Sequence, residues 1–360
     1  MSESLRSDAD LIGAVRAALE AIDHPLRAAP LACLQDKGLA HDHVRLCGTG
    51  VLARIPKQSQ LNLTAADNLL YQRICFERAQ DSHCVPRFFG YLPPSTFLPR
   101  GALLVEEIVG RSVDLTQDLG RIVESLAAIH ALAIPPESAR PPLLDQPDPL
   151  QALFDEINEQ ARYLSAAAIS AQVKSTIIFE MARLQDLCTG SVRPARCLIA
   201  FDGHPGNYVV RESAPQTFQA VLVDLEKCRY SYPSLDLAHA TLYTSTTWDA
   251  DVNAVLSGQQ VCDAYAGWAT AVGDAISNAA QGWHLPLRRA MWLWSLTWCA
   301  KWRCVSNTSA KLTVDGEDWS AYRSDVRLIN HVRNRVDHFL SAEAVGFVLN
   351  EFTHLENHLN

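Results

Sequence analysis

The chain has 360 residues, of which 48% are hydrophobic and 20% charged, and its formal net charge is −9. This composition is typical of an ordinary globular protein, and the length favours two lobes or domains over a single core. The negative charge argues against a general nucleic-acid binder, because such a protein needs a basic surface.

The apolar stretches and the cysteines indicate the compartment. The most apolar segment, residues 291–302, is interrupted by Lys301 and is too short to span a bilayer, so no membrane partner is expected. The polar, acidic first ten residues do not have the pattern of a secretory signal. The ten cysteines form no C-x-x-C pair and most lie in apolar runs, which favours reduced core thiols. We therefore expect a cytoplasmic protein.

The first hundred residues predict a strand-rich unit. Its expected elements, in chain order, are a helix over 11–22, a hairpin over 44–56, a helix over 64–80, and strands over 87–92 and 102–108. Gly48 and Gly50 lie in the hairpin turn. Thr64, followed three residues later by Asp67, is a helix start of the capping-box type.

After residue 108 the periodicity becomes mainly helical. The expected elements are helices over 119–132, 149–168 and 170–188, short strands over 198–201, 208–210 and 218–226, and mostly helices from residue 237 onward. This order predicts an α+β protein of two lobes, with a small β-rich lobe over 1–108 and a larger, mostly helical lobe over 109–360.

The segment LIAFDGHPGNYVV, residues 198–210, places a tight polar loop between two apolar strands. Asp202 and Asn207 lie in this loop, and Asp224 ends the apolar strand that follows. Antiparallel pairing of the last two strands would bring Asp224 back beside the loop. Two carboxylates and an amide oxygen are hard ligands that suit Mg²⁺. The alternative is a turn in which Asp202 and Asn207 only satisfy backbone donors.

The pattern D-x-H-P-x-N, an apolar strand ending in D-x-E, and then PSLDLA together resemble the aminoglycoside phosphotransferase and choline kinase family, which has a protein-kinase-like fold. The resemblance covers most of the chain. It implies an ATP- and Mg²⁺-dependent kinase that phosphorylates a hydroxyl group of a small molecule. It also implies that Asp202 accepts the hydroxyl proton, while Asn207 and Asp224 hold the metal against the ATP phosphates.

The same resemblance assigns a nucleotide site to the N-terminal lobe. A cation within residues 51–57 should face the phosphates; Arg54 is the favoured candidate and Lys57 is expected at the exit of the strand. Glu77 lies on the apolar face of the following helix and is expected to orient that cation, unless its head group simply faces solvent. The remaining expected nucleotide contacts are the turn residues Gly48 and Gly50, over the phosphates, and the main chain of Glu106 and Ile108, against adenine.

One departure from the family pattern concerns the residues before Asp202. The family usually has His-Gly there, whereas this chain has Ala200 and Phe201. This difference leaves open a non-catalytic nucleotide-binding regulator. His204 is more readily interpreted as a residue that structures the loop than as a catalytic one. Asp236 is expected to cap a helix and to support the catalytic loop.

The acceptor site should lie in the helical lobe. All eight tryptophans follow residue 247, and Trp294, Trp298 and Trp302 recur on one helical face. Such rings could hold a cationic acceptor, but a tryptophan stripe more often packs in a core. The acidic residues 315–318 are compatible with a simple solvated turn. A metal-dependent phosphoesterase built on Asp202, Asp224 and His204 is a third possibility.

Overall fold

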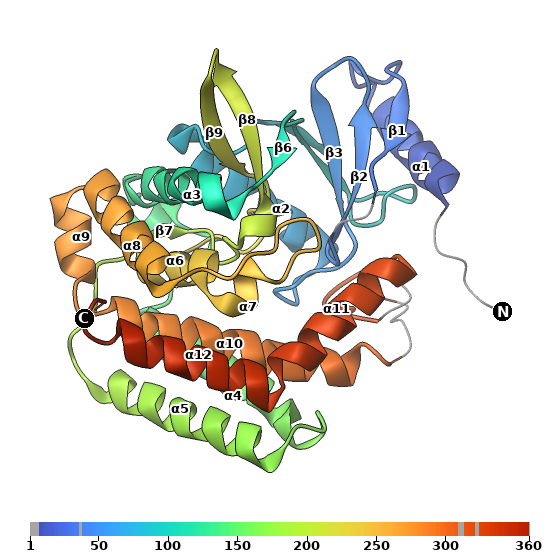
Figure 1. The fold of residues 1–360 in the computed structure, drawn as a ribbon. Helices are drawn as coiled ribbons and strands as arrows, with labels where there is room; N and C mark the ends of the chain where they lie inside the picture. Colours follow the sequence, from blue (N-terminus) through green and yellow to red (C-terminus); the bar gives the residue numbers. More distant parts are fainter. Residues whose placement is uncertain (1–6, 36–37, 309–312, 321–323, 360) are drawn as a thin grey trace.

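The N-terminal part of the molecule is built on one antiparallel sheet. The computed structural model describes residues 7–35, 38–308, 313–320 and 324–359. The strands run in the order β1-β2-β3-β5-β4. Their bounds are β1 Leu31–Cys33, β2 His41–Leu46, β3 Val51–Pro56, β4 Phe88–Leu92 and β5 Ala102–Glu106. In Figure 1 the strands β1, β2 and β3 of this sheet and the helix α1 (Asp8–Ala21) lie together at one end of the molecule, in blue.

The β2–β3 hairpin forms where the glycines predicted it. Gly48 and Gly50 both have positive φ angles, 77° and 71°, which residues with a Cβ rarely adopt. β5 shows the alternation expected of a strand that is buried on both faces. Ala102 and Leu104 pack with α1, whereas Leu103 and Val105 join the main core together with α2 (Ala65–Ala79). The Thr64 hydroxyl accepts the Asp67 amide and so caps α2 as expected.

After Glu106 the chain enters a region dominated by helices. The helices that organise this region are α3 Leu115–His130, α4 Pro149–Ala161, α5 Ala171–Thr189, α6 Pro233–Thr241, α7 Tyr243–Thr246, α8 Gly258–Val272, α10 His284–Val305, α11 Val326–Phe339 and α12 Ala342–Leu355. Figure 1 shows α4, α5, α10 and α12 lying together at the end opposite the sheet. The small sheet region and the large helical region confirm the predicted two-lobed α+β fold.

Two small sheets connect the lobes and carry the polar loop. One has the order β6-β8-β9 (Arg111–Ser112, Tyr208–Ala214, Thr217–Leu222), and in the other β7 (Cys197–Ile199) pairs with β10 (Arg229–Ser231). β8 and β9 are antiparallel, with Tyr208 opposite Leu222, so the segment after β9 returns to the loop that precedes β8. The strand predicted over 218–226 ends early at Leu222, because the facing strand begins at Tyr208.

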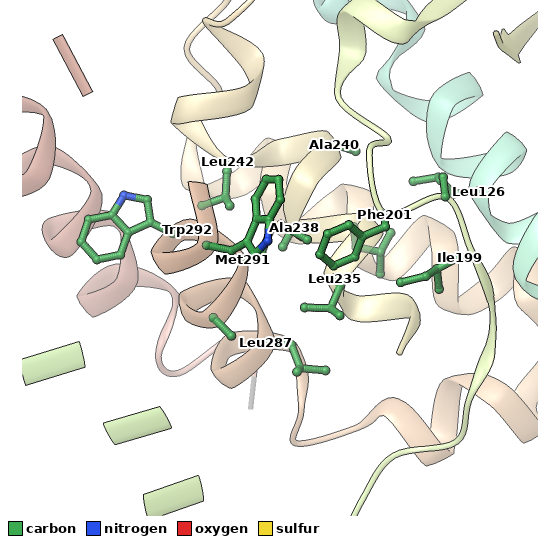
Figure 2. Close-up of a cluster of buried hydrophobic side chains, with 14 of the residues drawn as sticks. Leu126, Ile199, Phe201, Leu235, Ala238, Ala240, Leu242, Leu287, Met291 and Trp292 are labelled. Carbon is green, nitrogen blue, oxygen red and sulfur yellow. The ribbon is translucent and has the colours of Figure 1, made fainter. Parts of the chain in front are cut away.

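Helix α10 is the centre of the large lobe. It packs against α4, α5, α6 and α11. Trp292 and Trp302 on this helix are fully buried. Figure 2 shows how Leu287, Met291 and Trp292 of α10 continue the same apolar cluster that contains Leu235 and Phe201. The cluster ties the residues before Asp202 to the centre of the large lobe.

Within the described ranges, no helix is both long and apolar enough to cross a bilayer. All ten cysteines fall in those ranges, and each is a free thiol.

Candidate active site

Phe201 and Asp236 determine how the chain leaves β7. Phe201 has a φ of +61°, in the left-handed region that costs a residue with a side chain roughly 1–2 kcal/mol. The buried Asp236 carboxylate accepts hydrogen bonds from the Ala200 and Phe201 amides at 2.7 and 2.8 Å. The Phe201 ring is buried among Ile199 and Leu235 (Figure 2). These contacts hold the turn that presents Asp202.

Asp236 is itself oriented by a buried histidine. His130 Nε2 lies 3.1 Å from Asp236, and the Trp268 indole donates to His130 Nδ1 at 2.9 Å. Since Nδ1 accepts, Nε2 carries the proton and donates to the carboxylate. Asp236 therefore supports the backbone just before Asp202. It does not cap α6, because the cap residue Tyr232 precedes it and no side chain bonds the first amides of that helix.

The loop after Asp202 is also held by its own side chains. His204 Nδ1 accepts the Gly206 amide at 3.2 Å at the start of a short 3₁₀ turn, so His204 structures the loop as predicted. Asn207 donates its Nδ2 to the Asp202 carbonyl at 2.8 Å. This bond leaves Asn207 Oδ1 as an acceptor. Asp249 approaches so closely that a Cβ on Gly206 would lie 2.7 Å from its Oδ2, so the position requires glycine.

Asp224 follows β9 and lies at the same cavity. Its Oδ1 accepts from Arg54 at 2.5 Å and from the Glu226 amide at 3.3 Å. Asp224 Oδ2 and Asn207 Oδ1 therefore remain as candidate ligands for a hard cation, and they fit Mg²⁺, which commonly takes few protein oxygens. The structure thus brings Asp202, Asn207 and Asp224 together, as the spacing predicted.

His41 completes a second cluster with Asp224 and Glu226, whose ligand atoms lie within 4.8 Å of one another. The histidine does not suit a metal in this arrangement. Arg54 donates to its Nδ1 at 3.0 Å, and its Nε2 faces Gln72 Oε1 at 3.0 Å. Burial and the nearby Arg54 lower the pKa of His41 well below its usual range, so the ring is neutral and both nitrogens are already engaged.

Lys227 is a site residue that the sequence analysis did not identify. It follows Asp224 by three residues and is buried. Its Nζ lies 2.7 Å from Asp202 Oδ2 and 5.5 Å from the centre of the Trp294 ring. Burial acts to raise the pKa of Asp202, but the Lys227 ammonium, with smaller effects of His204 and His239, lowers it overall to well below its usual range. Asp202 is therefore ionised.

Arg54 occupies the position expected of the phosphate-facing cation. It lies in β3, lines the cavity and pairs with Asp224. Its partner on α2 is not Glu77. Glu77 bonds Arg73 one turn away and is partly exposed, so the solvent-facing alternative holds. The residue of α2 that is linked to Arg54 is Gln72. Its side chain bonds His41, and His41 in turn bonds Arg54.

Gly48 and Gly50 do not line the cavity, although Glu107, whose amide donates to the Gly50 carbonyl, does. Their turn lies just before the first residue of β3, Val51. The segment at the Arg54 end is instead the β1–β2 connection, which contributes Gly38 and Ala40 to the lining. Lys57, just beyond β3 as expected, is buried and donates to the Gly38 carbonyl at 3.1 Å, so it supports this connection.

One cavity of about 550 Å³ joins these groups, a size within the usual range for small-molecule sites. Glu106 and Ile108 line it, as expected of residues that contact adenine. The Glu106 carboxylate is held by Arg87 and Arg211.

Aromatic rings form the wall of the cavity on the side of the large lobe. The rings are Trp248, Trp294, Trp298, Trp319 and Phe339. Trp298 meets both Trp248 and Trp319 edge to face at 5.6 Å. The three tryptophans predicted on one helical face therefore have different environments. Trp302 packs in the core, whereas Trp294 and Trp298 line the cavity.

The acidic segment before Trp319 is structural. Asp315 accepts the Ala65 amide at the start of α2, and Glu317 pairs with Lys301 at 2.7 Å. Asp318 is buried, and its amide donates to Gln58. Asp315 is exposed, as expected of a solvated turn, whereas Asp318 is buried, and none of these three carboxylates lines the cavity.

His239 provides a test of the electrostatics of the site. It is buried beside Asp202, with Nδ1 3.2 Å from the Phe201 carbonyl, and burial lowers its pKa to about 4. Because the folded-state pKa lies below the unfolded one, stability is lost as the pH falls from about 6.5 toward 4.

Between pH 7 and 5 the wild type should lose about 1–2 kcal/mol more unfolding free energy than His239→Gln, measured by urea denaturation. Equal losses in the two proteins would contradict this assignment.

The model of the phosphotransferase enzyme family (APH) matches residues 48–271. No curated protein matches the sequence significantly. Among solved structures, the fold is similar to that of a putative aminoglycoside phosphotransferase from Ralstonia eutropha, with a TM-score of 0.59, 13% identity, and 91% and 96% of the two chains covered. It is also similar to choline kinase from Cryptosporidium parvum, with a TM-score of 0.57, 11% identity, and 98% and 97% covered.

A third similar structure is the ADP-bound aminoglycoside phosphotransferase APH(2″)-Ib, with a TM-score of 0.51, 13% identity, and 91% and 98% of the two chains covered. At these identities the solved structures establish the fold, whereas the family model covers more than half of the chain. The chain belongs to the phosphotransferase enzyme family.

Proposed function

We propose that the protein is an ATP- and Mg²⁺-dependent kinase that transfers the γ-phosphoryl group of ATP to a hydroxyl group of a small molecule. One observation carries the proposal. Asp202, the unengaged oxygens of Asn207 and Asp224, and the Arg54 guanidinium all lie at a single cavity between the two lobes. An ionised acceptor of the hydroxyl proton, two metal ligands and a phosphate-facing cation are the groups that phosphoryl transfer needs.

In this proposal residues 1–108 bind the nucleotide. Glu106 and Ile108 face adenine through their main chain, and Arg54 faces the phosphates. The connection between β1 and β2 takes the phosphate-covering place first expected of Gly48 and Gly50, because it adjoins Arg54. Support for a nucleotide comes from the similar fold of APH(2″)-Ib, which was solved with ADP.

Residues 109–360 supply the chemistry and the acceptor site. The acceptor oxygen forms a bond to the γ-phosphorus, the bond from that phosphorus to the bridging oxygen breaks, and ADP leaves. Asp202 orients the hydroxyl and receives its proton. Mg²⁺ held by Asn207 and Asp224 would neutralise charge on the phosphates. Arg54, which lines the same cavity, would add a second cation there.

The aromatic wall favours an acceptor that is a small molecule. Such an acceptor would place an apolar group or a single cationic group against Trp248, Trp294 and Trp298. Rings of this kind bind apolar and cationic groups through their faces. Asp249, beside Gly206, places one carboxylate at the edge of the wall. A choline kinase and aminoglycoside phosphotransferases are among the proteins with this fold, and the wall fits a compact amine better than a polycation.

The two alternative functions are less well supported. A non-catalytic regulator was suggested by Ala200 and Phe201 in place of His-Gly, yet Asp236 holds the backbone at both positions. A metal-dependent phosphoesterase would use His204 as a ligand, but its Nδ1 already accepts the Gly206 amide, which leaves only Nε2 for a metal. That alternative also gives Arg54 no role.

Binding of Mg-ATP should raise the melting temperature, because a ligand that binds the native state stabilises it by mass action. Asp224→Ala should lose most of this increase, measured against its own ligand-free melting temperature, whereas Asp202→Ala should lose much less. EDTA should reproduce the effect of Asp224→Ala in the wild type. Equal losses in the two variants would contradict the separate roles of metal ligand and base.

Turnover should be found in a panel of small hydroxyl-bearing amines, sugars and aminoglycosides, measured as ADP release with the phosphorylated product identified by mass spectrometry. We expect compact monoamines to be better acceptors than aminoglycosides, because the wall is mainly aromatic. Tight ATP binding without phosphorylation of any acceptor would favour the regulator. Hydrolysis of phosphate esters without ATP would favour the phosphoesterase.

A further inference from the structure

We propose that Lys227 is a second catalytic residue, whose ammonium group contacts the phosphoryl group during its transfer while it holds Asp202 in place. This inference rests on the proposed kinase function. It starts from the position of Lys227, which lines the cavity although the residue is only 8% exposed. A lysine buried to this extent at a cavity wall is uncommon unless its charge is used.

The hydrogen bonds of Lys227 leave part of its donor capacity unused. An ammonium group has three N–H donors. Among the described residues, Asp202 Oδ2 at 2.7 Å is the hydrogen-bond acceptor of Nζ, and the Trp294 ring lies beneath the charge at 5.5 Å. Trp294 is fixed by its own bond to Glu156 and by edge-to-face contact with Phe201. The lysine is therefore held on one side and open toward the cavity.

The charges around Lys227 keep it protonated. Burial alone would lower its pKa, but Asp202 and Glu226 raise it overall, with a further contribution from Asp224. The ammonium group contacts Asp202, the carboxylate that addresses the acceptor, and it lines the same cavity as Asp224, the carboxylate proposed to hold the metal. It stays charged at any pH at which the protein is expected to work.

The transferred phosphoryl group must pass through the same space. Its phosphorus bonds to an acceptor oxygen that Asp202 orients, and a metal ion that Asn207 and Asp224 would hold would neutralise charge on the phosphates. Lys227 contacts Asp202 and lines the same cavity as Asn207 and Asp224. Lys227 can keep one N–H on Asp202 and direct another to a phosphoryl oxygen, where negative charge must be stabilised in the transition state. The lysine gains and loses no proton in this step.

A purely structural role makes a different prediction. If Lys227 only neutralised Asp202, its removal would perturb the loop and weaken all ligands alike. A contact to the transferred phosphoryl group distinguishes nucleotides with and without a γ-phosphate. Binding of a non-hydrolysable ATP analogue and of ADP, each with Mg²⁺, therefore separates the two roles without any turnover.

The test compares Lys227→Met with the wild type, using Lys301→Met as a control because Lys301 pairs with Glu317 outside the cavity lining. In Lys227→Met we expect kcat to fall about 10²- to 10³-fold, as for loss of one transition-state donor. The additional melting-temperature increase given by the ATP analogue over ADP should disappear. The ADP response should remain, and Lys301→Met should behave as the wild type.

A second pair of variants covers the risk that a lone buried carboxylate prevents folding. Asp202→Asn combined with Lys227→Met removes both charges. The additional melting-temperature increase that the ATP analogue gives over ADP is then compared between this double variant and Asp202→Asn alone. The inference is overturned if the difference survives in the double variant, or if Lys227→Met loses both nucleotide responses equally or keeps wild-type kcat. A wild type that responds to neither nucleotide would contradict the kinase function itself, and the inference with it.

Discussion

Three hydrogen bonds converge on the buried carboxylate of Asp236, and the geometry of the site depends on them. Two come from the amides of Ala200 and Phe201 and one from His130. They hold Phe201 at a positive φ, which turns the chain so that Asp202 faces the cavity. The strain at Phe201 is offset by burial of its ring in the large-lobe core (Figure 2). The loop is thus held by its surroundings without the His-Gly pair that relatives usually have.

The convergence of Asp202, Asn207 and Asp224 could be predicted because it depends on local rules. Short apolar strands flank a polar loop, and antiparallel pairing of β8 and β9 returns the chain to it. The phosphate-covering segment could not be predicted in the same way. A glycine turn shows that a hairpin exists, but the end of the sheet at which it lies is set by the pairing of β3 with β5, which involves residues fifty positions apart.

The partners of the charged residues were equally hard to predict. Arg54 pairs with Asp224, 170 residues away, instead of Glu77 on the next helix. Lys227 carried a weak signal, since it directly follows the acidic pair Asp224 and Glu226, but only the structure brings it to Asp202. The tryptophan stripe on α10 shows the same limit. Its spacing indicates one face of a helix, whereas tertiary packing decides that Trp302 is core and Trp298 lines the cavity.

The central claim is that the loop held by Asp236 presents Asp202 as the working base of a phosphotransferase. The most direct measurement is the steady-state kinetics of Asp202→Asn with an acceptor that the wild type phosphorylates. The variant keeps the shape of the side chain but cannot accept the hydroxyl proton. We expect kcat to fall by about 10²- to 10⁴-fold, with little change in the KM for ATP. A kcat close to that of the wild type would contradict the account.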